Sequence, residues 1–140
     1  MGSDQPLDST FNDLIGIEWL SDDPDDARVR VPVRDQLKQP FGLVHGGVFS
    51  TLVESICSRA TAIQVFTDGM VATGQSLDIS FLRPITDGSV TVTARVRHRG
   101  RTSWVWEAEA GDDQGRLCAL ARMTIAVRPA PQGAKTESRD

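Results

Sequence analysis

The sequence predicts an α+β fold in which an antiparallel sheet wraps around one long central helix. From Val48 to Ile63, apolar residues recur at helical spacing on a stripe so wide that the helix should be mostly buried. From Met70 almost to the C-terminus the apolar period is two, which indicates strands with one apolar face each. Only one helix is available to cover those faces, which excludes a doubly wound parallel sheet.

The length and composition are those of one folded domain. The chain has 140 residues, of which 39% are hydrophobic and 24% charged, a balance that excludes a wholly disordered protein. We expect a single domain over residues 10–130, preceded by a flexible arm at 1–9. Residues 131–140 are polar with Gly and Pro, and we expect a flexible tail there.

The elements before the long helix are short. Residues 11–20 mix apolar and polar side chains and predict either a short helix or a first strand. The acidic run at 22–26 predicts a turn, and the alternation over 27–33 predicts a strand. Residues 34–43 have no clear period and should form a loop, whereas residues 67–69 should end the long helix.

Four strands are expected after the helix, at 70–82, 89–98, 103–110 and 116–127, in an antiparallel meander. Alternation places Arg95, Arg97, Arg99 and Arg101 on one strand face. These arginines are candidates to bind phosphates. The alternative is that Arg95 and Arg97 pair with glutamates at 107 and 109 on the next strand.

Charge and motif content exclude several classes of function. The 15 basic residues against 19 acidic ones give a net charge of −4, which argues against nucleic-acid binding. No apolar run is long enough to span a membrane, and the start lacks the features of a signal peptide, so we expect a cytoplasmic protein. The two cysteines, Cys57 and Cys118, form no C-x-x-C pair; we expect inert packing and no metal site.

A glycine-rich segment, Gly42 to Gly47, leads into the long helix. Glycines leave the backbone open to a ligand, and the first N–H groups of a helix have no internal partner. A carbonyl oxygen placed there would meet a ready hydrogen-bond donor. A glycine-rich turn without a ligand remains the alternative. His45 in this segment is either an acid–base group or a structural residue bonded to the backbone.

Glu54 is the second candidate for chemistry. Ser50, Glu54 and Ser58 are four residues apart and form a polar stripe on an otherwise apolar helix. A carboxylate held there would be partly desolvated, which raises its pKa and its basicity. Ser58 could hold a water molecule against it. The alternative is a helix edge that faces solvent.

These segments together resemble a known family. They are QPFGLVHGG at 39–47, Glu54 nine residues after His45, the strand from Met70 to the Arg-Pro at 83–84, and residues 115–129. The combination resembles the acyl-CoA thioesterases of the hot-dog fold over residues 10–130. It is most similar to the phenylacetate-pathway type and to the 4-hydroxybenzoyl-CoA thioesterases with a helical glutamate. The resemblance implies hydrolysis of an aromatic or short acyl-CoA, with no cofactor besides the coenzyme A of the substrate.

The resemblance also implies residue roles. Glu54 would be the nucleophile or general base, and the Gly46 N–H would polarise the thioester carbonyl. Gln39 would orient that carbonyl, and Ser58 would hold the attacking water. The family builds its site across a homodimer interface, and a homotetramer of two such dimers is expected.

The expected contacts to the rest of the acyl-CoA come from several loops and strand ends. The residues concerned are His45, Gly47, Arg83, Arg101, Thr102 and Arg128. Some relatives carry a further arginine just after the second Arg-Pro, where this chain has Ala130-Pro131, so one nucleotide contact is in question.

Two other functions remain open at this point. A hot-dog hydratase or dehydratase acting on enoyl- or hydroxyacyl-thioesters would require His45 to titrate in its mechanism. An acyl-CoA-binding module without chemistry would bind the thioester and release no product. The presence of Glu54 favours the thioesterase over both.

Overall fold

The computed structural model describes residues 10–131, so the expected arm at 1–9 and nearly all of the expected tail lie outside the described residues. The described elements follow in chain order: α1 (Thr10–Ile15), β1 (Glu18–Ser21), β2 (Ala27–Pro32), η2 (Asp35–Leu37), α2 (Gly46–Val65), η3 (Phe66–Asp68), β3 (Met70–Phe81), β4 (Ser89–Arg99), β5 (Ser103–Gly111) and β6 (Leu117–Pro129).

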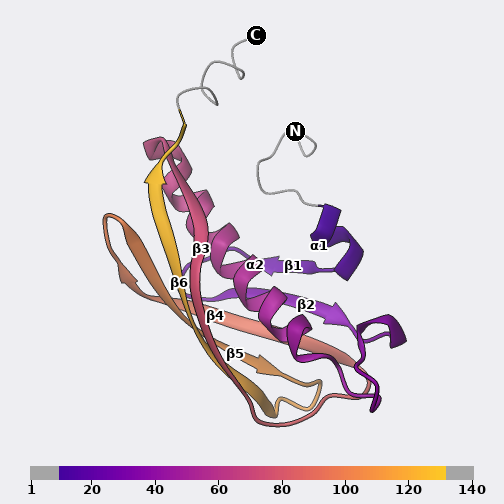
Figure 1. Cartoon of the computed structure of the whole chain (residues 1–140). Coiled ribbons are helices and arrows are strands. Elements are labelled where there is room, and N and C mark those ends of the chain that lie inside the picture. The colour runs from indigo at the N-terminus through magenta and orange to yellow at the C-terminus, as the bar shows by residue number, and fades with distance from the viewer. Residues whose placement is uncertain (1–9, 132–140) are drawn as a thin grey trace.

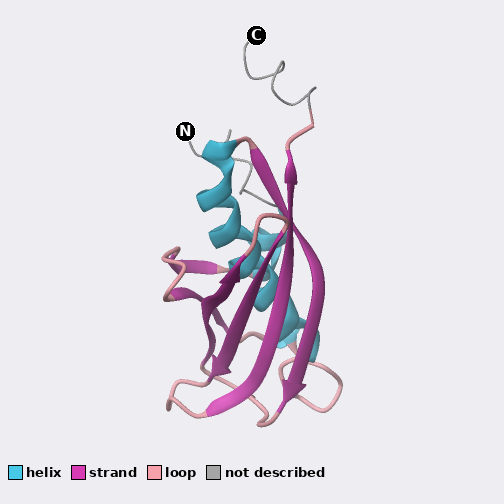
Figure 2. Ribbon diagram, turned by 90° about the vertical axis from the view of Figure 1, so that its left-hand side faces the viewer, coloured by secondary structure: helices cyan, strands magenta, loops and turns pink. Residues whose placement is uncertain are grey.

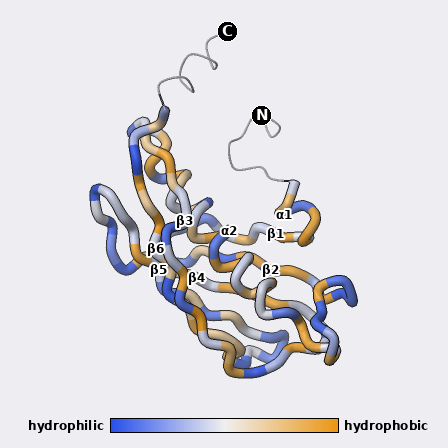
Figure 3. The backbone as a smooth tube through the Cα atoms, viewed as in Figure 1, coloured by the Kyte–Doolittle hydropathy of each residue, from blue (hydrophilic) through white to orange (hydrophobic). Residues whose placement is uncertain are grey.

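One six-stranded antiparallel sheet curves around α2 (Figures 1 and 2). The strand order is β1-β2-β4-β5-β6-β3, so β1 and β3 form the two edges. Apolar and polar residues alternate along the strands (Figure 3), which directs one face of the sheet toward the helix. The predicted α+β fold with one long helix is confirmed.

The predicted meander of four strands is wrong in one respect. β4, β5 and β6 are consecutive neighbours, but β3 lies beyond β6, and β2 occupies the place beside β4. Side-chain alternation identifies the buried face of a strand and carries no information about its neighbours. The consequence matters for the site, because β3 is left with a free edge within the described chain.

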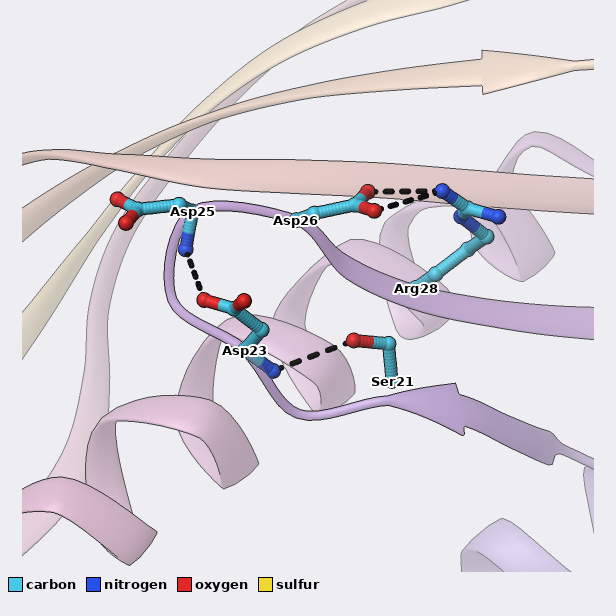
Figure 4. A network of polar contacts seen from close by, with 5 residues as sticks. All are labelled: Ser21, Asp23, Asp25, Asp26 and Arg28. Carbon is cyan, nitrogen blue, oxygen red and sulfur yellow. Dashed lines mark hydrogen bonds and ion pairs between the residues drawn. The ribbon is translucent and has the colours of Figure 1, made fainter.

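The N-terminal segment contains both elements that the sequence left as alternatives, α1 and β1. The predicted turn at 22–26 is also present and is held by local hydrogen bonds (Figure 4). The Asp25 N–H donates to Asp23 Oδ1 over 2.9 Å, and the Asp26 carboxylate accepts from Arg28 over 2.8 Å. The expected loop at 34–43 contains one short 3-10 turn, η2.

The core lies between α2 and the sheet. Trp106 on β5 is fully buried, and its Nε1 donates to Thr61 Oγ1 on α2 over 2.9 Å. The Thr61 hydroxyl donates in turn to the Cys57 carbonyl over 2.7 Å. These bonds satisfy the Trp106 indole and the Thr61 hydroxyl, and the first of them joins β5 to α2.

The arginines on β4 do not share one face. Val96 pairs with Trp106 but His98 pairs with Val105, so Arg97 is an extra, bulged residue. Arg97 forms an ion pair of 2.9 Å with Glu107, which confirms a cross-strand charge pair. After the bulge, Arg99 lies over the ring of its cross-strand neighbour Trp104, 5.0 Å from the centroid.

Candidate active site

The N-terminus of α2 leaves one backbone donor available. His45 caps the helix, and its Nδ1 accepts from the Gly47 N–H over 2.8 Å. The Val48 N–H donates to the His45 carbonyl over 2.9 Å. Among residues 10–131, the Gly46 N–H has no acceptor, so a ligand oxygen could bind there. The His45 ring has the structural, backbone-bonded arrangement.

The backbone at Gly46 does not require a glycine, because its φ is not positive. The neighbouring Phe81 ring requires one instead. A Cβ at this position would lie 2.9 Å from the ring of Phe81 at the end of β3. Phe81 is 54% exposed and packs edge-on against Phe49, with 5.9 Å between centroids. The free Gly46 N–H therefore lies beside an exposed aromatic wall.

Gln39 lies in the loop before α2 with its amide held in one orientation. Its Oε1 accepts from the Phe41 N–H over 2.5 Å, which identifies the oxygen because only an acceptor can meet that donor. Its backbone N–H donates to the Leu43 carbonyl, and its carbonyl accepts from the Gly42 N–H. The Nε2 group is left as the donor that can orient a substrate carbonyl.

Glu54 lines a groove of about 340 Å³ beside α2. Aromatic rings and helix side chains form the walls, among them Phe11, Trp19, Thr51, Glu54, Ser55 and Ser58. The structure thus brings Glu54 and Ser58 to one site. Glu54 is exposed in the single chain, as in the solvent-facing alternative that the sequence left open. Any desolvation must come from the substrate or from a second protomer.

The outer wall of the groove is braced against α2. Ser55 Oγ donates to Asn12 Oδ1 on α1 over 3.1 Å. Arg59 Nε donates to Asp22 over 3.0 Å, and its guanidinium lies 4.6 Å from the centroid of the Trp19 ring. The part of the groove formed by Phe11 and Trp19 is therefore fixed to the helix that carries Glu54. These two residues were not predicted from the sequence, because nothing in their local pattern indicates a ligand.

The backbone donor and the carboxylate are too far apart to serve one thioester within one chain. Gly46 and Glu54 are two helical turns apart, about 12 Å along the axis. A donor to the carbonyl oxygen and a group attacking its carbon must both lie within about 3 Å of the same carbonyl. Within one chain, therefore, the Gly46 N–H and the Glu54 carboxylate do not meet at one thioester.

The expected coenzyme A residues separate into two places. Arg128 Nη1 donates to the Thr102 carbonyl over 2.5 Å, and the Val127 N–H donates to the same oxygen over 2.9 Å. Arg128 thus joins the Arg101-Thr102 turn. Arg83 lies two residues beyond the opposite end of β3. Val71, which pairs with Arg128, is about 33 Å along the strand from Phe81 at that end.

Metal ligands and reactive thiols can be examined among the described residues. No group of three His, Cys, Asp or Glu side chains in residues 10–131 could hold a metal ion. Cys57 and Cys118 are buried, and burial raises the pKa of both thiols, which makes them poor nucleophiles. Of the helices described, none is long and apolar enough to cross a membrane.

Comparison with known proteins identifies the family. The family model of the thioesterase superfamily matches residues 41–119. Thioesterase PA1618 of Pseudomonas aeruginosa is 36% identical, with a TM-score of 0.82, over 86% of this chain and 87% of that one. The PaaI protein of the E. coli phenylacetic acid degradation operon is 29% identical, with a TM-score of 0.77, over 85% and 84% of the two chains.

A third solved structure is the thioesterase SAV0944 of Staphylococcus aureus. It is 28% identical, with a TM-score of 0.82, over 86% of this chain and 100% of that one. Its structures include one variant with a glutamate replaced by alanine and one with a glutamine replaced by alanine. These relatives share the fold described above. The chain therefore belongs to the thioesterase superfamily, and it is a hydrolase of that class built on the hot-dog fold.

Proposed function

We propose that this protein hydrolyses an aromatic or short acyl-CoA to the free acid and coenzyme A. The observation that carries the proposal is the groove in which Glu54 and Ser58 lie beside the rings of Phe11 and Trp19. A flat acyl group would fit against those rings with its thioester near the carboxylate. The similarity to PaaI, from a phenylacetic acid degradation operon, supports an aromatic substrate.

The chemistry needs one carboxylate and one oxyanion donor. The Gly46 N–H polarises the thioester carbonyl, and the Gln39 amide orients it. Glu54 attacks the carbonyl carbon or removes a proton from a water held by Ser58. The thiolate of coenzyme A then leaves. Attack by water gives the free acid directly, whereas attack by Glu54 gives a mixed anhydride that water hydrolyses to the free acid and the regenerated carboxylate. Neither route requires a metal or a further cofactor.

The variants of SAV0944 support this assignment. The substituted glutamine and glutamate of that protein are 15 residues apart. Gln39 and Glu54 have the same separation here. The equal spacing supports Gln39 and Glu54 as the corresponding pair in this chain.

A homodimer joined through β3 would complete the site. Within one chain, Gly74 lies beside Glu54 and Phe81 lies beside Gly46. If the free edge of β3 pairs antiparallel with the same strand of a partner, Gly74 can lie near Phe81 of the partner subunit. Glu54 then faces Gly46 of the partner subunit, and the two-fold axis falls near Leu77 or Asp78.

The same pairing would assemble the coenzyme A site from both chains. It brings Arg83 close to the start of the partner's β3, which lies beside Arg128 of the partner subunit. The Arg101-Thr102 turn lies there too. Guanidinium groups from two chains would then bind the phosphates. We extend the proposal to a cytoplasmic homotetramer of two such dimers.

The first test is an acyl-CoA panel with a thiol-reactive dye. Acetyl-, hexanoyl-, phenylacetyl-, benzoyl- and 4-hydroxybenzoyl-CoA should release thiol, with the aryl members fastest. Glu54→Ala should abolish turnover and retain substrate binding, and Glu109→Gln on the outer face of β5 is the matched control.

Two results would overturn the proposal. Hydration of crotonyl-CoA without thiol release would favour the hydratase. Tight acyl-CoA binding without any product would favour the binding module. Full activity of Glu54→Ala would refute the catalytic assignment alone.

A further inference from the structure

Gly74 interrupts the strand pattern of β3 at the point where Glu54 approaches the sheet. A Cβ at this position would lie 3.1 Å from Glu54 Oε2 and 3.3 Å from its Cδ. It would also lie 2.8 Å from Met123 Cε on β6. The carboxylate of Glu54 therefore rests where a side chain at position 74 would begin.

The backbone does not require a glycine there. The φ angle of Gly74 is not positive, so any residue could adopt its conformation. A glycine within a strand weakens it and often marks a close approach or a bulge. Both occur here, because the pairing with β6 shifts register between Gly74 and Ser76. The absence of a side chain at Gly74 leaves space for the Glu54 carboxylate.

We propose that Gly74 is a positioning residue for Glu54. Because Gly74 has no side chain, the Glu54 carboxylate can lie against the edge strand β3, in the position from which it acts on the thioester. This inference rests on the proposed function. Gly74 itself touches no reacting atom, and it acts only through the placement of the carboxylate. The placement is set by β3, the strand that we propose for the dimer interface.

The variant Gly74→Ala tests this directly. The three atoms that the new methyl group meets lie at the ends of two flexible side chains, so the fold should persist and the carboxylate should move. Misplacement by about 1 Å can lower a rate by about 100-fold. We expect kcat to fall between about 10- and 100-fold with KM nearly unchanged, while Tm stays the same or rises, because alanine suits a strand better than glycine.

Gly111→Ala is the matched control. Gly111 ends β5, and a Cβ there meets only the Arg116 carbonyl oxygen at 3.3 Å, away from the groove. This variant should retain the kcat of the parent protein. It separates the general effect of replacing a strand glycine from the effect on Glu54.

A second substitution tests the coupling. Aspartate is one methylene shorter than glutamate, so the carboxylate of Glu54→Asp withdraws from position 74. Gly74→Ala should then cost less than about threefold in kcat in the Glu54→Asp background, against 10-fold or more in the parent. Equal losses in both backgrounds would show a structural effect of the alanine and overturn the inference.

The outcomes distinguish this inference from the proposed function. A parent protein without thioesterase activity refutes the proposed function. An active parent that loses activity in Glu54→Ala but keeps it in Gly74→Ala refutes the positioning role alone. A rise in KM with kcat unchanged would assign Gly74 to substrate binding and would also refute it.

Discussion

The indole N–H of Trp106 donates to the hydroxyl of Thr61 over 2.9 Å, and both residues are fully buried. A buried indole donor without a partner carries its full desolvation cost. Thr61→Val keeps the shape of the side chain and removes the acceptor. We expect a loss of about 1–3 kcal/mol in the free energy of unfolding, measured by urea denaturation. Thr61→Ser retains the hydroxyl and should recover most of the loss; equal losses would contradict the role of the hydrogen bond.

Ser58 should affect turnover more than binding. It lines the groove one helical turn beyond Glu54, where its hydroxyl can hold the attacking water. We expect Ser58→Ala to lower kcat by about 10-fold with KM within about twofold, in steady-state assays with the best panel substrate. Ser58→Thr keeps a hydroxyl and should stay close to the parent. An alanine variant with unchanged kcat would remove Ser58 from the mechanism.

Arg128 should contribute to binding of the nucleotide end of the substrate. Its guanidinium is already fixed against the Thr102 carbonyl, so it is ordered for a phosphate contact. Arg128→Ala should raise KM for the acyl-CoA by about 10-fold or more, the effect of losing a hydrogen bond to a charged group. A truncated acyl thioester without the nucleotide should show no such change. The control Arg97→Ala removes an arginine paired with Glu107 on the outer face.

Asp112 should stabilise the turn between β5 and β6 in a pH-dependent manner. The Arg116 backbone N–H, the Arg116 side chain and the Gln114 N–H lower the pKa of its carboxyl below the ordinary value. A lowered folded-state pKa contributes stability above the unfolded pKa, near pH 4, and the contribution is lost as pH falls through the folded value. Asp112→Asn should therefore lower Tm at pH 7 and have a smaller effect at pH 3. An equal effect at both values would contradict this linkage.

The dimer through β3 can be tested by a disulfide at its axis. Residues that oppose themselves across a two-fold axis in an antiparallel pair lie close enough for a disulfide. We expect either Leu77→Cys or Asp78→Cys to form a covalent dimer under oxidation, visible on a non-reducing gel. Thr91→Cys, on the central strand β4, should stay monomeric on the same gel. Failure of both β3 variants to cross-link would contradict this register.

The sequence predicts much of this fold because the long elements have a clear period. The apolar stripe of α2 and the alternation in β4, β5 and β6 need only local information, and both predictions are confirmed. The position of β3 beside β6 depends on long-range strand pairing, and the local sequence pattern carries no information about such pairing. The bulge at Arg97 is hidden for the same reason, since one extra residue reverses the faces of those that follow.

The candidate site shows the same division. The glycines at 46 and 47 and the isolated Glu54 are visible in the sequence as breaks in an apolar helix. The groove wall from Phe11 and Trp19 is not visible, because it depends on how α1 and β1 pack against α2. The role of Gly74 could have been predicted from the sequence, because a glycine inside a strand pattern often marks a place where another group lies close to the backbone. The exposure of Glu54 is a property of the single chain and follows from no residue pattern.

The two-turn spacing of Gly46 and Glu54 on α2 has a consequence for mixtures of subunits. In the proposed dimer each active site takes its carboxylate from one chain and its backbone donor from the other. Dilution that separates the chains should abolish both sites at once, so specific activity should fall with protein concentration. A chain that lacks Glu54, mixed with the parent, should give heterodimers with one working site, half the activity of the parent dimer.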